Sequence, residues 1–318
     1  MSETLPHLAS SGVAASRSPR WRVWWRLARP FSLTAAVVPI AVGTAVAVAD
    51  GTFYSFALFG AMLLASILIQ IATNMFNEYY DFKRGLDNQD TVGIAGAIVR
   101  ERTAPLAVFG AAIGCFVVAL GLGLLIVART DPMVFVVGTA CALAGYLYTG
   151  GPLPVAYTPL GEIEVFVFMG PVMVGLAYFI QAGALSSPAL WASAPIACLV
   201  AAILLGNNIR DIVADRRAGR STLPIVFGKT GAVVIYTILI GAAFVATVLA
   251  TLARQLPVTV LAGLVTAPLA LRLIRLYGTS EGPEQLDAGV RGSAALHGRF
   301  GLLFALGIWV GPLVPSIG

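Results

Sequence analysis

The sequence is poor in charged residues. Of its 318 residues, 11% are Asp, Glu, Lys or Arg and 58% are hydrophobic, whereas a soluble domain carries about 25% charged residues. No Lys or Arg occurs from Pro30 to Phe82 or from Thr130 to Ile209. This composition excludes a water-soluble globular fold and predicts an integral membrane protein.

Residues that bind soft metals or form disulfides are also scarce. The three cysteines, Cys115, Cys141 and Cys198, fall in apolar runs, and the two histidines, His7 and His297, are isolated. This pattern excludes a disulfide framework and gives no basis for a zinc site. The net charge of +5 mostly reflects membrane topology, so it does not indicate nucleic-acid binding.

Nine apolar runs have about the length that a helix needs to cross a bilayer. The runs are continuous and do not alternate, which favours helices over a β-barrel. We predict an all-α membrane protein with nine transmembrane helices around a central cavity. The expected spans are residues 32–49, 53–76, 106–128, 132–149, 163–181, 189–206, 231–252, 257–274 and 298–315.

The two parts of the chain differ in character. Residues 29–318 form one predicted membrane domain, and residues 1–28 form a disordered or interfacial tail with an anchor at Trp21, Trp24 and Trp25. Basic residues predict the orientation: with the N-terminus inside, 18 of the 20 Lys and Arg residues lie on the inner side, and only Arg129 and Arg254 lie outside. We therefore expect a multi-pass protein of the cell membrane with a cytoplasmic N-terminus.

Two polar clusters at the inner ends of the second and sixth spans match each other. Each has an Asn, a polar residue three positions on, an Asp four further on and a Gly after four more. The matched residues are Asn74, Asn77, Asp81 and Gly85, and, 134 positions later, Asn208, Asp211, Asp215 and Gly219. The offset predicts a repeated four-helix unit with a ninth helix added, which would bring the clusters together across the cavity.

The clusters predict a site for a divalent cation and a diphosphate. Residues four apart lie on one helix face, so Asn74, Asn77, Glu78 and Asp81 share a face, as do Asn208, Asp211 and Asp215. Neighbouring carboxylates repel one another unless a cation neutralises them, and oxygen ligands suit Mg²⁺. The interleaved cations Lys83, Arg84, Arg210 and Arg220 suit phosphate oxygens. Solvated topology anchors are the alternative, but they leave the repeated spacing unexplained.

Two connecting segments are predicted. Residues 86–104 form either a mobile lid over the inner mouth or a plain solvated connector. Residues 278–292, rich in Gly and carrying Glu281, Glu284 and Asp287, predict an ordinary solvated loop.

These motifs resemble those of the UbiA superfamily of intramembrane prenyltransferases. The resemblance rests on Asn77-Glu78-Tyr79-Tyr80-Asp81 after the second span and on Asp211-Ile212-Val213-Ala214-Asp215 after the sixth. More narrowly, the chain resembles the 1,4-dihydroxy-2-naphthoate polyprenyltransferases (MenA type) of menaquinone synthesis. That likeness rests on Ala28-Arg29-Pro30, Tyr148-Thr149-Gly150-Gly151-Pro152, Leu160-Gly161-Glu162 and Asn207-Asn208-Ile209-Arg210-Asp211.

The resemblance implies a Mg²⁺-dependent enzyme of nine helices that transfers a polyprenyl group from its diphosphate to 1,4-dihydroxy-2-naphthoate, with loss of the carboxylate. It assigns the metal and the catalysis to Asn77, Glu78, Asp81, Asp211 and Asp215. It assigns substrate binding to Asn74, Lys83, Arg84, Asp87, Tyr146, Tyr148, Asn207, Asn208, Arg210 and Arg220. Glu78 stands where the superfamily usually has Asp, and Gly85 where many relatives have a third Asp, with Asp87 nearby as a substitute.

Two alternatives remain open at this point. Another UbiA-type acceptor, such as 4-hydroxybenzoate, homogentisate, or a haem or chlorophyll precursor, would use the same diphosphate site. A secondary transporter would have polar residues near the membrane midplane, whereas the charges here cluster at one side of nearly charge-free spans.

Overall fold

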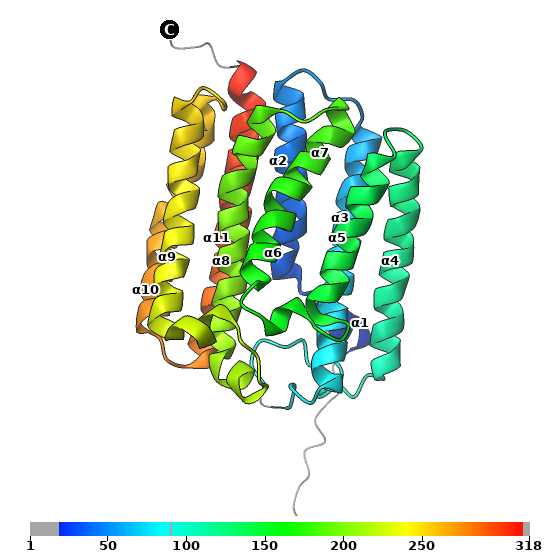
Figure 1. Ribbon diagram of the computed structural model, residues 1–318, viewed down its shortest axis with the longest axis vertical. Coiled ribbons are helices and arrows are strands. Elements are labelled where there is room, and N and C mark those ends of the chain that lie inside the picture. Colours follow the sequence, from blue (N-terminus) through cyan, green and yellow to red (C-terminus); the bar gives the residue numbers. More distant parts are fainter. Residues whose placement is uncertain (1–18, 90, 314–318) are drawn as a thin grey trace, which may run out of the picture.

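The computed structural model describes residues 19–89 and 91–313. Figure 1 shows a bundle of long helices that run side by side. All the regular structure in the described residues is helical, which confirms the predicted all-α class. The helices are α1 (Arg20–Ala28), α2 (Thr34–Ala49), α3 (Phe56–Lys83), α4 (Pro105–Val127), α5 (Met133–Thr149), α6 (Gly161–Val167), α7 (Met173–Ala182), α8 (Ser187–Arg217), α9 (Leu223–Leu252), α10 (Ala267–Thr279) and α11 (Pro283–Val310).

The number of membrane-spanning stretches agrees with the prediction. Within the described residues, 8 helical stretches are long and apolar enough to cross a membrane, and the shorter apolar helix Met133–Thr149 corresponds to the predicted fourth span. A π-helical turn at Phe168–Val172 joins α6 to α7, and a 3-10 helix at Val258–Thr266 leads into α10, so each of these pairs forms one stretch.

The interior of the bundle is built from helices α2, α8 and α11, which pack against one another. Small residues let their backbones approach closely, as is usual where lipid supplies no hydrophobic drive between helices. A Cβ atom on Gly301 of α11 would lie 2.2 Å from Val38 Cγ1 of α2, and one on Gly298 of α11 would lie 2.8 Å from Thr34 Cγ2 of α2. The outer helices instead expose large apolar side chains, such as Val117 and Leu120 of α4.

Several helices extend beyond the predicted spans. α3 continues seven residues past residue 76, and α8 continues eleven past residue 206, so both polar clusters lie inside helices and not after them. Hydropathy predicts where lipid contact ends, whereas the backbone hydrogen bonds of a helix continue into a polar environment. The prediction of a solvated loop at 278–292 is wrong for the same reason, because α11 begins at Pro283.

The described part of the N-terminal segment is also helical. α1 buries Val23 and Leu27 and exposes Trp21 and Trp25, so it is amphipathic, as an interfacial anchor requires. The chain turns at Arg29, whose φ is +48°, and then enters α2 through a 3-10 turn at Pro30–Leu33. Residues 1–18 of the predicted tail lie outside the described residues.

The connector, residues 86–104 of which all but residue 90 are described, packs onto the bundle through residues 95–98. Ala95, Ala97 and Ile98 are buried in a cluster with Val23 and Leu27 of α1 and with α4. The prediction of a plain solvated connector is therefore wrong. The segment lies at the same end of the bundle as α1 and the turn that follows α5 (Figure 1), and we call this the polar end.

Candidate active site

The two matched clusters end their helices in the same way. After α3, the amide of Leu86 donates to the carbonyl of Asp81 and Gly85 has a φ of +72°. After α8, the amide of Arg220 donates to the carbonyl of Asp215 and Gly219 has a φ of +71°. A left-handed glycine with this hydrogen bond is the Schellman helix end. The Asp-to-Gly spacing found twice in the sequence is therefore a helix-capping motif that places an Asp in the last turn.

A single arginine joins the two clusters. The Arg220 guanidinium donates to Asp81 Oδ1 at 2.7 Å and to Asp215 Oδ1 at 2.9 Å. The other Asp215 oxygen, Oδ2, is buried and has no hydrogen-bond partner among the described residues. The expectation that the second and sixth spans would bring Asp81 and Asp215 together agrees with this geometry, although the repeat itself stays a prediction.

Aromatic contacts hold Arg220 in place. Its guanidinium carbon lies 4.9 Å from the centre of the Tyr157 ring, and that of Arg84 lies 5.2 Å from the same centre. Arg84 also donates to the carbonyl oxygens of Thr149 and Gly151. Arg84 and Tyr157 line a cavity of about 270 Å³ beside the bridge. Arg84, which was predicted to contact phosphate, thus joins the end of α3 to the end of α5 and the turn that follows it.

Arg210 and Asp211 form a second charged group. Arg210 donates to both carboxylate oxygens of Asp211, at 2.8 and 2.7 Å, and to Asp287 Oδ1 at 2.7 Å. Asp287 comes from α11, the helix whose first turns were predicted to be a loop. A Cβ atom on Gly93 would lie 2.3 Å from the Arg210 guanidinium, so the connector closes directly onto this arginine.

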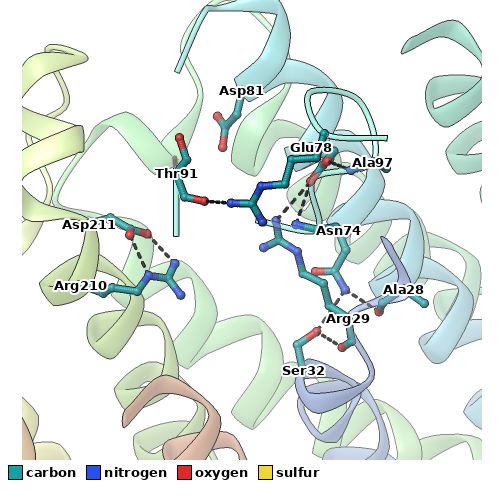
Figure 2. A network of polar contacts seen from close by, with 12 residues as sticks. Ala28, Arg29, Ser32, Asn74, Glu78, Asp81, Thr91, Ala97, Arg210 and Asp211 are labelled. Carbon is teal, nitrogen blue, oxygen red and sulfur yellow. Dashed lines mark hydrogen bonds and ion pairs between the residues drawn. The ribbon is translucent and has the colours of Figure 1, made fainter. Parts of the chain in front are cut away.

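Glu78 holds the connector in place. Its Oε1 accepts a hydrogen bond from the Ala97 amide at 2.8 Å, and its Oε2 accepts one from the Ala95 amide at 3.2 Å. Arg29 approaches the same carboxylate at 3.9 Å (Figure 2). Asn74, one turn earlier, donates to the Ala28 carbonyl and to Ser32 Oγ. Glu78, predicted to bind the metal, therefore holds the connector, and Asn74, predicted to bind substrate, holds the end of α1 and the turn after it. Both predicted roles stay predictions.

The remaining predicted residues are divided between this end and the apolar interior. Asn208 donates to Glu162 Oε1 at 2.8 Å, and the Tyr146 hydroxyl is 2.8 Å from that of Tyr80. Tyr148 packs against Gly161. Asn77 and Asn207 are half-buried, and Lys83 is exposed with its amino group 6.0 Å from the Tyr79 ring centre.

Electrostatics at the polar end favour a cation. Burial, together with the charges of Asp81 and Glu78, raises the pKa of Asp87 to about 7. Burial alone would lower the pKa of Arg220, but the charges of Asp81 and Asp215 more than offset it and leave that pKa raised. No three acidic, His or Cys side chains among the described residues lie close enough to form a ready-made metal centre. The two carboxylates Asp81 and Asp215, with one unpaired oxygen on Asp215, fit Mg²⁺. This ion usually binds one or two protein carboxylates and completes its coordination with water and phosphate oxygens.

Comparisons with known proteins agree with this architecture. Residues 36–288 match the UbiA prenyltransferase family. The 1,4-dihydroxy-2-naphthoate octaprenyltransferase of Bacillus subtilis (strain 168) is 37% identical over 94% of this chain and 96% of its own length. The chain belongs to the UbiA prenyltransferase family.

Solved structures of UbiA homologues share the fold. That of an Aeropyrum pernix K1 homologue in its apo form has a TM-score of 0.62 at 17% identity, covering 87% of this chain and 97% of that one. A homologue from Archaeoglobus fulgidus, bound to DMAPP and Mg²⁺, has a TM-score of 0.55 at 18% identity, covering 89% and 99%. The bundle described above is therefore the UbiA fold.

Four residues that contact the predicted site residues were not predicted to belong to the site: Arg29, Tyr157, Glu162 and Asp287. Arg29 and Glu162 stand in the motifs that carry the family resemblance, but no role was assigned to them. Glu162 had a detectable signal, because it is one of few acidic residues in the long stretch without Lys or Arg from Thr130 to Ile209. Asp287 was hidden by the wrong assignment of its segment to a loop. Tyr157 had no signal in its sequence neighbourhood, since its role arises from two arginines that are distant in sequence.

Replacing Glu78 with alanine is expected to loosen the connector. The substitution removes the acceptor for the Ala95 and Ala97 amides, and each charge-assisted bond is worth roughly 1.5–3 kcal/mol. Trypsin should then cut after Arg100 or Arg102, in purified protein, at least about tenfold faster than in the wild type. Glu284→Ala, at the start of α11, is the control. An unchanged cleavage rate in Glu78→Ala would contradict the anchoring role.

Proposed function

We propose that this protein transfers a polyprenyl group from an allylic polyprenyl diphosphate to 1,4-dihydroxy-2-naphthoate, with loss of the carboxylate as CO₂ and release of diphosphate, to give the reduced (quinol) form of demethylmenaquinone. The observation that carries the proposal is the meeting of Asp81, Asp215 and Arg220 at the polar end of an apolar bundle. The similarity to the Bacillus subtilis octaprenyltransferase along nearly the whole chain supports the choice of acceptor.

Asp81 and Asp215 are the residues proposed to hold Mg²⁺, with Asp211, Asn77 and Glu78 as the further predicted ligands. Held by these residues, Mg²⁺ would supply positive charge to neutralise the departing diphosphate. Arg220 lies between the two carboxylates and offers its guanidinium to phosphate oxygens in the fork geometry that suits them. When it turns to phosphate, Asp81 and Asp215 lose their present counter-ion and are free to bind a metal.

The apolar interior takes the isoprenoid tail, and the polar end takes the diphosphate. The residues between them face the carbon that is transferred. Tyr146, one of the residues predicted to bind substrate, forms a hydroxyl pair with Tyr80 within an aromatic group that includes Phe76, and we propose that its ring stabilises positive charge on the allylic carbon. Water is kept away from that carbon because the connector covers the end of the bundle, with Gly93 against Arg210.

Product identification tests the proposal against the other acceptors. Purified protein with Mg²⁺ and farnesyl diphosphate is given 1,4-dihydroxy-2-naphthoate or 4-hydroxybenzoate, and products are identified by mass. We expect a prenylated naphthalene product that has lost CO₂. A product from 4-hydroxybenzoate alone would favour the other acceptor class, and no diphosphate release with any acceptor would favour a transporter.

We further propose that the polar end faces the cytoplasm across the cell membrane, as the distribution of basic residues predicts. The physical requirement is that both clusters open to one side, since one diphosphate cannot be shared across about 30 Å of hydrocarbon. Asp81 and Asp215, both bonded to Arg220, meet that requirement.

Cysteine labelling tests the orientation. In a background without the three native cysteines, a Cys at Asn88 should react with a membrane-impermeant thiol reagent only after cell lysis. A Cys at Arg129, between α4 and α5 at the opposite end, should react in intact cells. Labelling of position 88 in intact cells would contradict the proposed orientation. Ser316, another useful outer position by sequence, lies outside the described residues.

A further inference from the structure

Besides Asp215, the carboxylates Glu162 and Glu164 each have a buried oxygen without a hydrogen-bond partner among the described residues. Of these two, Glu162 is the one bonded by a side chain of α8, the helix that carries Asp211 and Asp215. Glu162, in the first turn of α6, is 4% exposed. Its Oε1 accepts a hydrogen bond from Asn208 Nδ2 at 2.8 Å, and its Oε2 is buried with no hydrogen-bond partner among the described residues. An unpaired buried carboxylate oxygen is costly, and such groups in folded proteins nearly always have partners. A ligand that donates a hydrogen bond would satisfy it.

The position of Glu162 relates it to the diphosphate site. Asn208, its partner, lies one helical turn before Asp211 and two before Asp215 on the same face of α8. Glu162 is therefore held about two helical turns deeper in the bundle than Asp215. The carbon that is transferred is attached to the diphosphate and extends toward the apolar interior, so the atom that attacks it must lie at this depth.

An aromatic ring lies beside the same turn of α6. Tyr148 packs on Gly161: a Cβ atom there would lie 3.5 Å from Tyr148 Cε2 and 3.6 Å from its hydroxyl. Glu162 is the next residue of that turn. The Tyr148 ring is therefore close to Glu162, and aromatic rings stack favourably on flat aromatic ligands.

We propose that Glu162, oriented by Asn208 and flanked by Tyr148, forms the binding site for the aromatic acceptor, and that its free oxygen accepts a hydrogen bond from a ring hydroxyl. This rests on the proposed prenyl transfer to a hydroxylated aromatic. The bond fixes which ring carbon faces the prenyl carbon, and a carboxylate acceptor increases the electron density of that ring. A metal ion is disfavoured here, because the Asn208 amide already points its N–H group at the carboxylate.

Steady-state kinetics of the purified wild type and of Glu162→Gln, with farnesyl diphosphate and 1,4-dihydroxy-2-naphthoate, test the site. We expect kcat/KM for the acceptor to fall about 10- to 100-fold, as loss of a hydrogen bond to a charged group implies. The KM for the diphosphate should change less than about twofold. Glu284→Gln, the same substitution at an exposed carboxylate in the first turn of α11, is the control and should leave acceptor use close to that of the wild type. Unchanged acceptor kinetics in Glu162→Gln, or an equal loss in Glu284→Gln, would overturn the assignment.

Methyl ethers of the acceptor give a measurement that a merely structural role would not change. The two monomethyl ethers of 1,4-dihydroxy-2-naphthoate each lack one hydroxyl donor. One of these ethers blocks the hydroxyl that Glu162 contacts, and the wild type should use that ether poorly. Glu162→Gln should use the same ether no worse than the wild type does, because the hydrogen bond is already lost. Additive losses for both ethers would mean that the residue and the hydroxyls act independently, and would overturn the proposal.

Acceptor binding separates this inference from the proposed function. The fluorescence of the naphthoate should be quenched on binding to the wild type, with binding at least about tenfold weaker in Glu162→Gln. If the wild type transfers no prenyl group but binds the naphthoate in a Glu162-dependent way, the proposed reaction fails and the site stands. If transfer occurs and binding does not depend on Glu162, the site fails and the reaction stands.

Discussion

Replacing Asp81 or Asp215 with alanine is expected to reduce prenyl transfer at least about 100-fold, a loss typical of removing one group that stabilises developing charge. The two carboxylates meet at Arg220, one from each matched cluster, and Asp215 has an unpaired buried oxygen. Asp211→Ala should cause a similar loss, because it removes the carboxylate that binds Arg210 on two nitrogens. Mg²⁺-dependent product formation at matched protein concentration is the measurement.

The control is Asp131→Ala at the opposite end of the bundle, where the carboxylate accepts a hydrogen bond from the Met133 amide. That variant should retain nearly the full rate. Asp81→Asn and Asp215→Asn preserve side-chain volume, so they separate loss of charge from loss of packing. Near-wild-type transfer by any of the alanine variants at positions 81, 211 and 215 would remove that residue from the proposed metal and diphosphate site.

Arg220→Ala should lower kcat/KM for the prenyl diphosphate by about 100-fold, since the guanidinium is proposed to pass from the carboxylates to phosphate oxygens. The acceptor KM should change far less. Arg220→Lys should recover part of the loss, because lysine keeps the charge but lacks the planar fork that bonds Asp81 and Asp215 together.

Arg217 is the matched control for Arg220, as an exposed arginine three residues away at the same helix end. Arg217→Ala should leave both kinetic constants close to those of the wild type. If Arg220→Ala lowered kcat/KM for the acceptor more than kcat/KM for the prenyl diphosphate, the assignment of Arg220 to the diphosphate subsite would be wrong. Equal losses in Arg217→Ala and Arg220→Ala would reduce its role to general charge at the helix end.

The clusters themselves were predictable from sequence, and their local contacts were not. Asp81 and Asp215 were identified by a repeated spacing, and the structure explains that spacing by two Schellman helix ends. The spacing carried no information about side-chain direction beyond a shared helix face. Asp211 bonds Arg210, and Glu78 bonds the connector, because partners from distant segments lie beside them.

The sequence by itself determined that the protein lies in a lipid bilayer, that its fold is all-α and that its charged clusters lie at one end of the helices. Long apolar runs leave only helices as a stable structure in lipid, since every backbone polar group must be satisfied within its own segment. Only the tertiary structure decided which charges pair. Asp287 reaches Arg210 across 77 positions, and Arg220 reaches Asp81 across 139. The strength of such an ion pair depends on the distance between its charges and on their burial. The number of residues between two positions along the chain gives neither of these quantities.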